Sequence, residues 1–129
     1  MKHILITIIA AVVLVGCGKS RPTEPPIAKA PDISIHDAAK IGNIEAIKQH
    51  IGAGTEVKAK NKGGRTPLHW ANNKEIAELL IDAGADVNAE DGDGDTSLDW
   101  AIMRNHTEIA DLLHKHGGKT GEELKAEGK

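Results

Sequence analysis

The residues most suggestive of chemistry are three aspartates at alternate positions, Asp91, Asp93 and Asp95, in the run DGDGD. Carboxylates at this spacing open a calcium-binding loop, in which a glycine at the sixth position makes the turn and a bidentate glutamate at the twelfth completes the ligand set. Here the sixth position is Thr96 and the twelfth is Ile102. Because the closing ligand is missing, the pattern predicts a solvated loop tip, and we expect no metal site.

Nucleophiles and bases for catalysis are scarce. The chain has one cysteine, Cys17, near its N-terminus, and no serine stands in a G-x-S-x-G turn. His69 has no accompanying nucleophile, so we expect no catalytic role for it. His114 and His116 are two residues apart and would face different sides of a helix, so they predict no zinc site. We expect no catalytic residue, no cofactor and no small-molecule substrate.

The composition is that of a small, acidic chain with an aliphatic core. The 129 residues allow one small domain, 40% of them are hydrophobic, and two tryptophans are the only aromatic residues. The formal net charge of −3 provides no general attraction for a polyanion, so no nucleic acid is expected among the partners.

The N-terminus predicts a targeting signal. Lys2 and His3 precede an apolar stretch that is shorter than the roughly 20 residues of a membrane-spanning helix, as in a cleaved signal. The stretch ends in LVGC, which resembles the lipobox of bacterial lipoproteins. The resemblance implies that residues 1–16 are a cleaved signal peptide and that acyl chains on Cys17 hold the protein on a membrane.

The segment that follows, residues 17–31, carries four prolines and predicts an extended, semi-rigid tether. In the lipoprotein family an aspartate directly after the lipidated cysteine commonly retains the protein in the inner membrane. Gly18 stands at that position here. The resemblance therefore implies the bacterial cell envelope, on the outer membrane facing the periplasm or the cell surface.

Three segments of the remaining chain align with one another. Their helix alanines, Ala38, Ala71 and Ala101, are 33 and 30 residues apart. The middle segment, TPLHWANNKEIAELLIDAGADVNAE, is similar to the ankyrin repeat, whose period is about 33 residues. The resemblance covers residues 32–119 and implies an all-α fold, a short ankyrin-repeat solenoid of about three helix-turn-helix repeats with hairpin fingers. In this family the histidine of TPLH, here His69, orders turns within and between repeats through hydrogen bonds, so the resemblance implies a structural role for it. Residues 120–129 are left as a polar C-terminal tail.

The residues of the middle repeat also predict two helices on physical grounds. Thr66 is suited to cap a helix, and Pro67 fits the first helical position, where its missing N–H costs nothing. Ile76 and Leu80 recur at helical spacing, and Gly84 ends that second helix. A single unit of this kind cannot enclose its own apolar face, so neighbouring repeats must stack, and about three are needed for stability.

Departures from the family pattern lead to further expectations. The middle repeat is three residues shorter between Ala71 and Glu75 than the third repeat is at the same place, which predicts a stunted first helix. Asn105 replaces the usual glycine, which predicts left-handed backbone there.

Two features stay ambiguous or point to packing. Trp70 and Trp100 occupy equivalent positions before the helix alanines and predict core packing between repeats. Thr120 and Glu123 fit either a capping box on a short terminal helix or a frayed end.

In ankyrin proteins the freely varying positions on the fingers and after the paired alanines project to the concave face. The resemblance places the partner-binding residues at the following positions: Lys40, Ile41, Lys62, Arg65, Asn72, Asn73, Asp93, Asp95, Met103 and Arg104. It implies a membrane-anchored protein-protein interaction module that recruits or steadies another protein. Two alternatives stay open: a self-associating structural lipoprotein of the envelope, and an enzyme whose site is not recognisable.

Overall fold

The structure of the chain is a computed structural model that describes residues 31–128. The predicted signal peptide, the predicted lipidation site at Cys17 and the predicted tether up to residue 30 lie outside the described residues.

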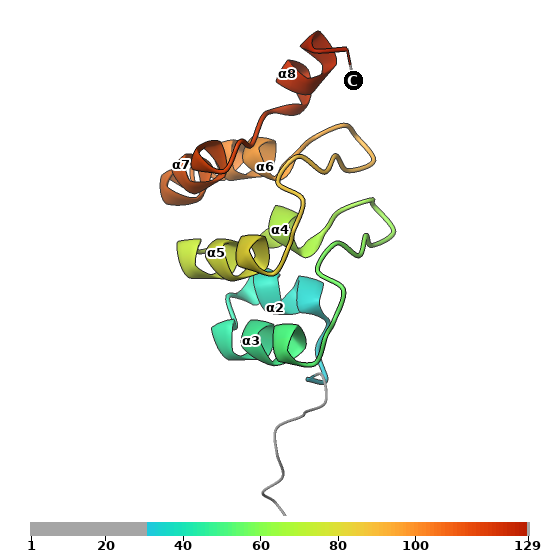
Figure 1. The fold of residues 1–129 in the computed structure, drawn as a ribbon, viewed down its shortest axis with the longest axis vertical. Coiled ribbons are helices and arrows are strands. Elements are labelled where there is room, and N and C mark those ends of the chain that lie inside the picture. Colours follow the sequence, from blue (N-terminus) through green and yellow to red (C-terminus); the bar gives the residue numbers. More distant parts are fainter. Residues whose placement is uncertain (1–30, 129) are drawn as a thin grey trace, which may run out of the picture.

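The chain from residue 31 to residue 128 contains seven α-helices and no β-strand (Figure 1). The helices, in chain order, are α2 (Ile35–Ile41), α3 (Ile44–Gly52), α4 (Pro67–Trp70), α5 (Lys74–Asp82), α6 (Ser97–Met103), α7 (Thr107–Lys115) and α8 (Gly121–Ala126). The prediction of an all-α fold is confirmed.

The helices form a two-layered stack (Figure 1). α2, α4 and α6 pack on one another as an inner layer, and α3, α5 and α7 pack as an outer layer. Two loops project beside the inner layer. We call residues 53–65, between α3 and α4, the basic finger, and residues 83–95, between α5 and α6, the acidic finger. The first two repeats are thus each a helix pair followed by a finger, as the sequence predicts, whereas the third helix pair is followed by α8.

Alanines and aliphatic side chains fill the interior. The repeat alanines Ala38, Ala71 and Ala101 are each no more than 5% exposed, and such small side chains let neighbouring inner helices approach closely. The larger side chains that are fully enclosed between the layers are Ile47, Leu68, Ile76, Leu80, Leu98 and Leu113.

The first helices of the repeats begin at paired caps. In the third repeat, Thr96 and Asp99 form a capping box, in which each side chain bonds the backbone N–H of the other. In the middle repeat the N–H of Thr66 donates to Nδ1 of His69 at 3.0 Å, and Nε2–H of His69 donates to the carbonyl of Asp95 at 3.2 Å. His69 therefore ties its own helix to the next finger, which is the structural role predicted for it.

The first helix of the middle repeat is short, as predicted. α4 has four residues, whereas α2 and α6 have seven each. Counting from the repeat alanines, residues 40–42 of the first repeat and residues 103–105 of the third have no counterpart in the middle repeat. The middle helix of the inner layer is therefore shorter than the helices on both sides of it.

The turn between the two helices of a repeat has the same left-handed backbone geometry in the first and third repeats, although the residue at this position differs. Gly42 follows α2 with a φ of 80°, and Asn105 has a φ of 61° at the equivalent place after α6. Asparagine tolerates this region better than other residues with a Cβ atom. The prediction for Asn105 is confirmed.

α8 closes the C-terminal end of the inner layer. Thr120 and Glu123 form the capping box that was one of the two expected outcomes. Leu124 is only 3% exposed, and the N–H of Gly121 donates to Oδ2 of Asp99 at 2.7 Å. The segment after residue 119 is thus a helix docked on the third repeat as far as residue 126.

Candidate functional site

Two tryptophans and three cations meet on the finger side of the inner layer. Trp70 ends α4 and Trp100 lies in α6, and their ring centroids are 5.5 Å apart at an interplanar angle of 48°. Arg65 comes from the base of the basic finger, Arg104 follows α6, and Lys40 lies in the last turn of α2. We call these five residues the Trp–Arg cluster.

The cations of the cluster sit over the indole rings. The guanidinium carbon of Arg65 is 4.6 Å from the centroid of Trp100 and 5.6 Å from that of Trp70. The corresponding distances for Arg104 are 4.7 and 5.2 Å. Nζ of Lys40 lies 5.2 Å from the ring of Trp70. All three distances to Trp70 fall within the range of cation–π attraction, so the aromatic pair gathers positive charge around itself.

The prediction that Trp70 and Trp100 pack in the core is wrong in one respect. Both contact neighbouring repeats, but both are half-buried and not enclosed. The alanine-filled interior leaves no room for an indole, so the rings lie on the finger side. The signal that sequence reasoning missed is the presence of arginines near both repeat tryptophans, because exposed aromatic and arginine side chains together are typical of binding sites.

Asp91 organises the acidic finger beneath the cluster. Its Oδ1 accepts hydrogen bonds from the N–H groups of Asp93 and Asp95, at 2.9 and 3.0 Å. Its Oδ2 accepts from Nε1 of Trp100 at 2.9 Å and from Nε of Arg65 at 3.2 Å. The carboxylate thus satisfies the indole N–H and links both fingers to α6.

Those hydrogen bonds change the acidity of Asp91. Burial alone raises the pKa of its carboxyl, but the bonds from the backbone of Asp95, the indole of Trp100, the backbone of Asp93 and the guanidinium of Arg65 outweigh burial and lower the pKa to about 2. Asp91 is therefore a buried anchor that is charged at neutral pH. It is a structural residue, whereas the sequence predicts only a solvated loop tip around it.

Arg104 differs from Arg65 in its partners. Arg65 bonds Asp91 and also lies 3.7 Å from Asp93. Arg104 makes no ion pair with any residue between 31 and 128. Burial lowers the pKa of Arg104, and the neighbouring positive charge of Arg65 lowers it further. The cluster therefore contains a partly desolvated cation that no carboxylate of the described residues neutralises.

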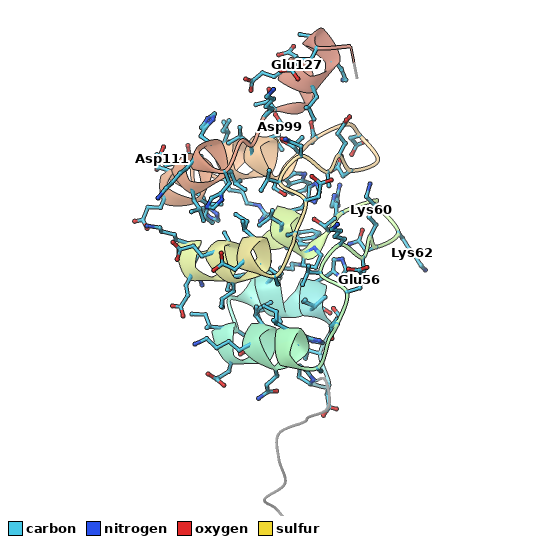
Figure 2. The ribbon with its side chains drawn as sticks, in the orientation of Figure 1. Glu56, Lys60, Lys62, Asp99, Asp111 and Glu127 are labelled. Atoms are coloured by element: carbon cyan, nitrogen blue, oxygen red, sulfur yellow. The ribbon has the colours of Figure 1, made fainter. Side chains whose placement is uncertain are left out.

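The structure brings part of the predicted partner-binding set together. Lys40, Arg65 and Arg104 belong to the Trp–Arg cluster, and Asp93 joins it through Arg65. Lys62 stands apart at the tip of the basic finger, pointing away from the helices (Figure 2).

Other residues of the predicted partner-binding set make hydrogen bonds that stabilise the fold. Asn73 is the N-cap of α5, where its Oδ1 accepts from the N–H of Ile76 at 2.9 Å. Asn72 donates from Nδ2 to the carbonyl of Lys40 at 2.9 Å. The carbonyl of Asp95 accepts the bond from His69 described above, and its own side chain is half-buried.

The apolar members of the predicted set are exposed. Ile41 is 63% exposed and Met103 is 59% exposed, at the ends of α2 and α6. Ile102, which the prediction omitted, is 51% exposed beside Met103. These three are the large hydrophobic side chains that the described part of the chain leaves to solvent, and they lie on the two repeats that flank the shortened one.

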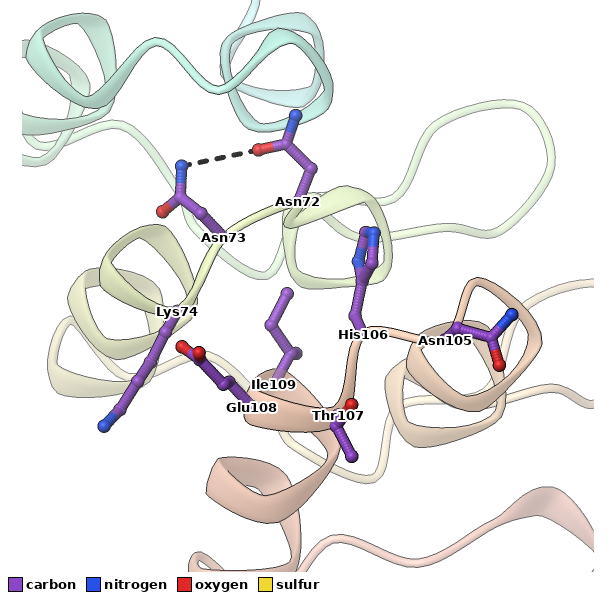
Figure 3. Close-up of a pocket in the computed structure, with 8 residues that line it drawn as sticks. All are labelled: Asn72, Asn73, Lys74, Asn105, His106, Thr107, Glu108 and Ile109. Atoms are coloured by element: carbon purple, nitrogen blue, oxygen red, sulfur yellow. Dashed lines mark hydrogen bonds between the residues drawn. The ribbon is translucent and has the colours of Figure 1, made fainter.

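A hollow of about 310 Å³ lies between the second and third repeats (Figure 3). Asn72, Asn73 and Lys74 line it from the turn before α5 and the start of that helix, and residues 105–109 line it from the turn before α7 and its first turn. His106 is the N-cap of α7, and its Nδ1 is buried without a hydrogen-bond partner among the described residues. The hollow lies where the middle repeat lacks three residues.

Residues 31–128 lack two further kinds of site. They hold no group of three or more histidine, cysteine or acidic residues arranged to bind a metal ion. None of their helices is long and apolar enough to cross a membrane.

Comparison with known proteins assigns the family. Residues 35–123 match the family described as ankyrin repeats (3 copies). The match covers more than half of the chain, and the chain therefore belongs to the ankyrin-repeat family. Ankyrin-repeat proteins are in general interaction modules that bind other proteins and not enzymes.

Individual relatives are similar over parts of the chain. A putative ankyrin-containing lipoprotein of Leifsonia xyli subsp. xyli is 34% identical over 88 residues, which cover 53% of this chain and 35% of the relative. An acyl-CoA-binding domain-containing protein 4 of Oryza sativa subsp. japonica is 51% identical over 37 residues, and a protein VAPYRIN-LIKE of Medicago truncatula is 46% identical over 37 residues. These two alignments each cover 29% of this chain and 11% and 8% of the relatives. The chain thus spans about a third or less of the curated relatives it matches.

Proposed function

We propose that this chain recruits or steadies a partner protein at the bacterial envelope, binding it on the side of the stack that carries the fingers and the inner helices. The observation that carries the proposal is the Trp–Arg cluster. Tryptophan and arginine are enriched among the residues that dominate protein–protein binding energy, above all where they are partly desolvated. Ile41 and Met103, which are next to Lys40 and Arg104 in the sequence, are exposed and add apolar surface.

We further propose that Cys17 carries the lipid that anchors the protein. The support is the LVGC motif and the similarity to a relative whose name includes the word lipoprotein. In this proposal residues 1–16 are removed, residues 17–31 form the tether, residues 32–119 are the binding domain and residues 120–129 are the tail. Gly18 favours the outer membrane.

Anchoring is tested with a fatty-acid analogue that can be labelled. The wild-type chain should incorporate the label, and the Cys17→Ser variant should not. Label that persists in the serine variant would contradict the lipobox. The interaction proposal does not depend on this result.

Partner binding is tested by capture from envelope extracts. The full chain should retain a heterologous protein, and the double variant Ile41→Ser, Met103→Ser should retain less of it. Asp111→Asn, an exposed position on α7 in the outer layer (Figure 2), is the matched control and should change nothing. Equal capture by the double variant would move the site elsewhere on the molecule.

Two other results of the capture experiment would favour different functions. Recovery of the chain alone, together with a mass above that of a monomer in light scattering, would favour a self-associating envelope protein. The proposal assigns no catalytic role to any residue, so turnover of a substrate by the purified chain would overturn it in favour of an enzyme.

A further inference from the structure

The positive charge of the Trp–Arg cluster is incompletely balanced by the protein itself. Arg65 is neutralised by Asp91 and Asp93. Arg104 lies over both indole rings and Lys40 lies over that of Trp70, and neither makes an ion pair with a residue of the described chain. Two guanidinium groups within 6 Å of the same two rings repel each other, and an added anion would relieve that repulsion.

Asp91, Asp93 and Asp95 of the acidic finger form no ion pair with Arg104 or Lys40. Asp91 is enclosed in its four hydrogen bonds, and Asp93 is the second partner of Arg65. Burial and the carboxylates of Asp91, Asp99 and Asp93 raise the pKa of Asp95, while Lys125 of α8 lowers it. The charge that stabilises Asp95 thus comes from α8 and not from the cluster.

The shortened middle repeat shapes the surface around these cations. α4 ends at Trp70, so Lys40 reaches over this ring from α2 and Arg104 reaches over it from the turn after α6. The residues next to Lys40 and Arg104 in the sequence are Ile41 and Met103, and both side chains are exposed. A chain segment that crosses Trp70 would therefore meet these two cations, and the exposed aliphatic side chains belong to their neighbours in the sequence.

An arginine that stacks on an aromatic ring is preorganised to bind a carboxylate. Stacking fixes the guanidinium plane and leaves its N–H edges free, and those edges match the two oxygens of a carboxylate. Phosphate would fit the same edges. The formal net charge of −3 and the neighbouring acidic finger oppose a long polyanion such as nucleic acid, whereas a single carboxylate between apolar side chains meets little repulsion.

From this charge and shape we propose that the Trp–Arg cluster binds an acidic peptide segment of a partner protein, with a carboxylate on Arg104 and Lys40 and aliphatic side chains beside it on Ile41 and Met103. The inference rests on the proposed function and adds the chemistry of the partner. Arg104 is the specificity-determining residue.

Peptides displayed on phage in random sequence are the probe, and the full chain held in detergent micelles is the target. Selected peptides should be enriched in aspartate and glutamate next to leucine, isoleucine or valine. Since Trp70 and Trp100 are the only aromatic residues of the chain, a synthetic copy of a selected peptide should change the intrinsic fluorescence in a saturable way. A copy with asparagine and glutamine in place of the acids should not.

Variants assign the binding to the cluster. Arg104→Gln should weaken the peptide about tenfold or more, because it removes a charge-assisted pair, and Arg104→Lys should fall between the two. Lys40→Gln, at an exposed side chain, should also weaken it. Lys115→Gln, at an exposed position on α7, is the charge-matched control and should leave the affinity unchanged.

The outcomes separate the inference from the proposed function. The inference would be overturned if the selected peptides lacked acidic residues. It would also be overturned if acidic peptides bound the Arg104→Gln and Lys40→Gln variants as tightly as the wild type. Neither result would contradict the proposal of an interaction module. Saturable binding of a single-stranded oligothymidylate in place of peptides would overturn the inference in favour of nucleic acid. No selected peptide and no captured envelope protein would overturn both.

Discussion

Replacing Asp91 by asparagine should destabilise the fold far more than its place in a surface finger suggests. The side chain of Asp91 is 0% exposed, and its carboxylate accepts four hydrogen bonds. Asparagine can still accept the two bonds from the backbone of Asp93 and Asp95. Its amide nitrogen cannot accept from Trp100 or Arg65, so donors would face a donor in a buried place.

The magnitude follows from the acidity of the group. The pKa of Asp91 falls from 3.8 to about 2, which corresponds to about 2 kcal/mol of preference for the charged form in the folded state. The unsatisfied donors add a cost of about 1–2 kcal/mol. We expect Asp91→Asn to lower the free energy of unfolding at neutral pH by about 3–4 kcal/mol.

The sign of the pH dependence is a second check on the same group. The folded-state pKa is below that of the unfolded chain, so the stabilisation by Asp91 is fully present above the unfolded value of 3.8. It is lost as the pH falls towards about 2. The difference in stability between wild type and Asp91→Asn should therefore shrink over that interval.

Urea unfolding followed by tryptophan fluorescence and circular dichroism measures the effect. Asp93→Asn is the matched control, because Asp93 has a side chain that is 75% exposed and lies 3.7 Å from Arg65. Exposed pairs of this kind contribute about 0.5 kcal/mol. If Asp91→Asn and Asp93→Asn unfold at the same urea concentration, the argument for a buried anchor is wrong.

Three further predictions concern other contacts. Burial lowers the pKa of His69, so the folded protein keeps a neutral ring while the unfolded chain takes up a proton below pH 6.5; stability measured by thermal unfolding should fall as the pH drops below that value, and His69→Gln should remove this part of the dependence. Gly64→Ala should destabilise more than Gly54→Ala in urea unfolding, since both have positive φ but only at Gly64 would a Cβ atom lie 2.9 Å from the backbone of Gly92; equal losses would show that the fingers are not in tight contact. Leu124→Ala should cost about 2 kcal/mol and raise amide exchange in α8 first, because this leucine is 3% exposed; unchanged exchange would contradict the docking of α8.

The sequence alone determined the features that depend on neighbouring residues. Caps such as Thr66 and Thr96, the helical spacing of Ile76 and Leu80, and the missing residues after Ala71 are local signals. Backbone geometry responds to local signals because each helix end must satisfy its own N–H groups within a few residues. The repeat architecture and the stunted α4 were therefore predictable.

Only the tertiary structure decided the site. The sequence marks Trp70 and Trp100 as large apolar residues at a repeat position, which favours the core. The stack encloses alanines there, so the rings turn to the finger side, where Arg65 and Arg104 approach from segments far apart in the chain. Asp91 likewise gains its partners only after two fingers and a helix meet. Contacts of this kind depend on how much space the packed repeats leave, and no local pattern encodes that space.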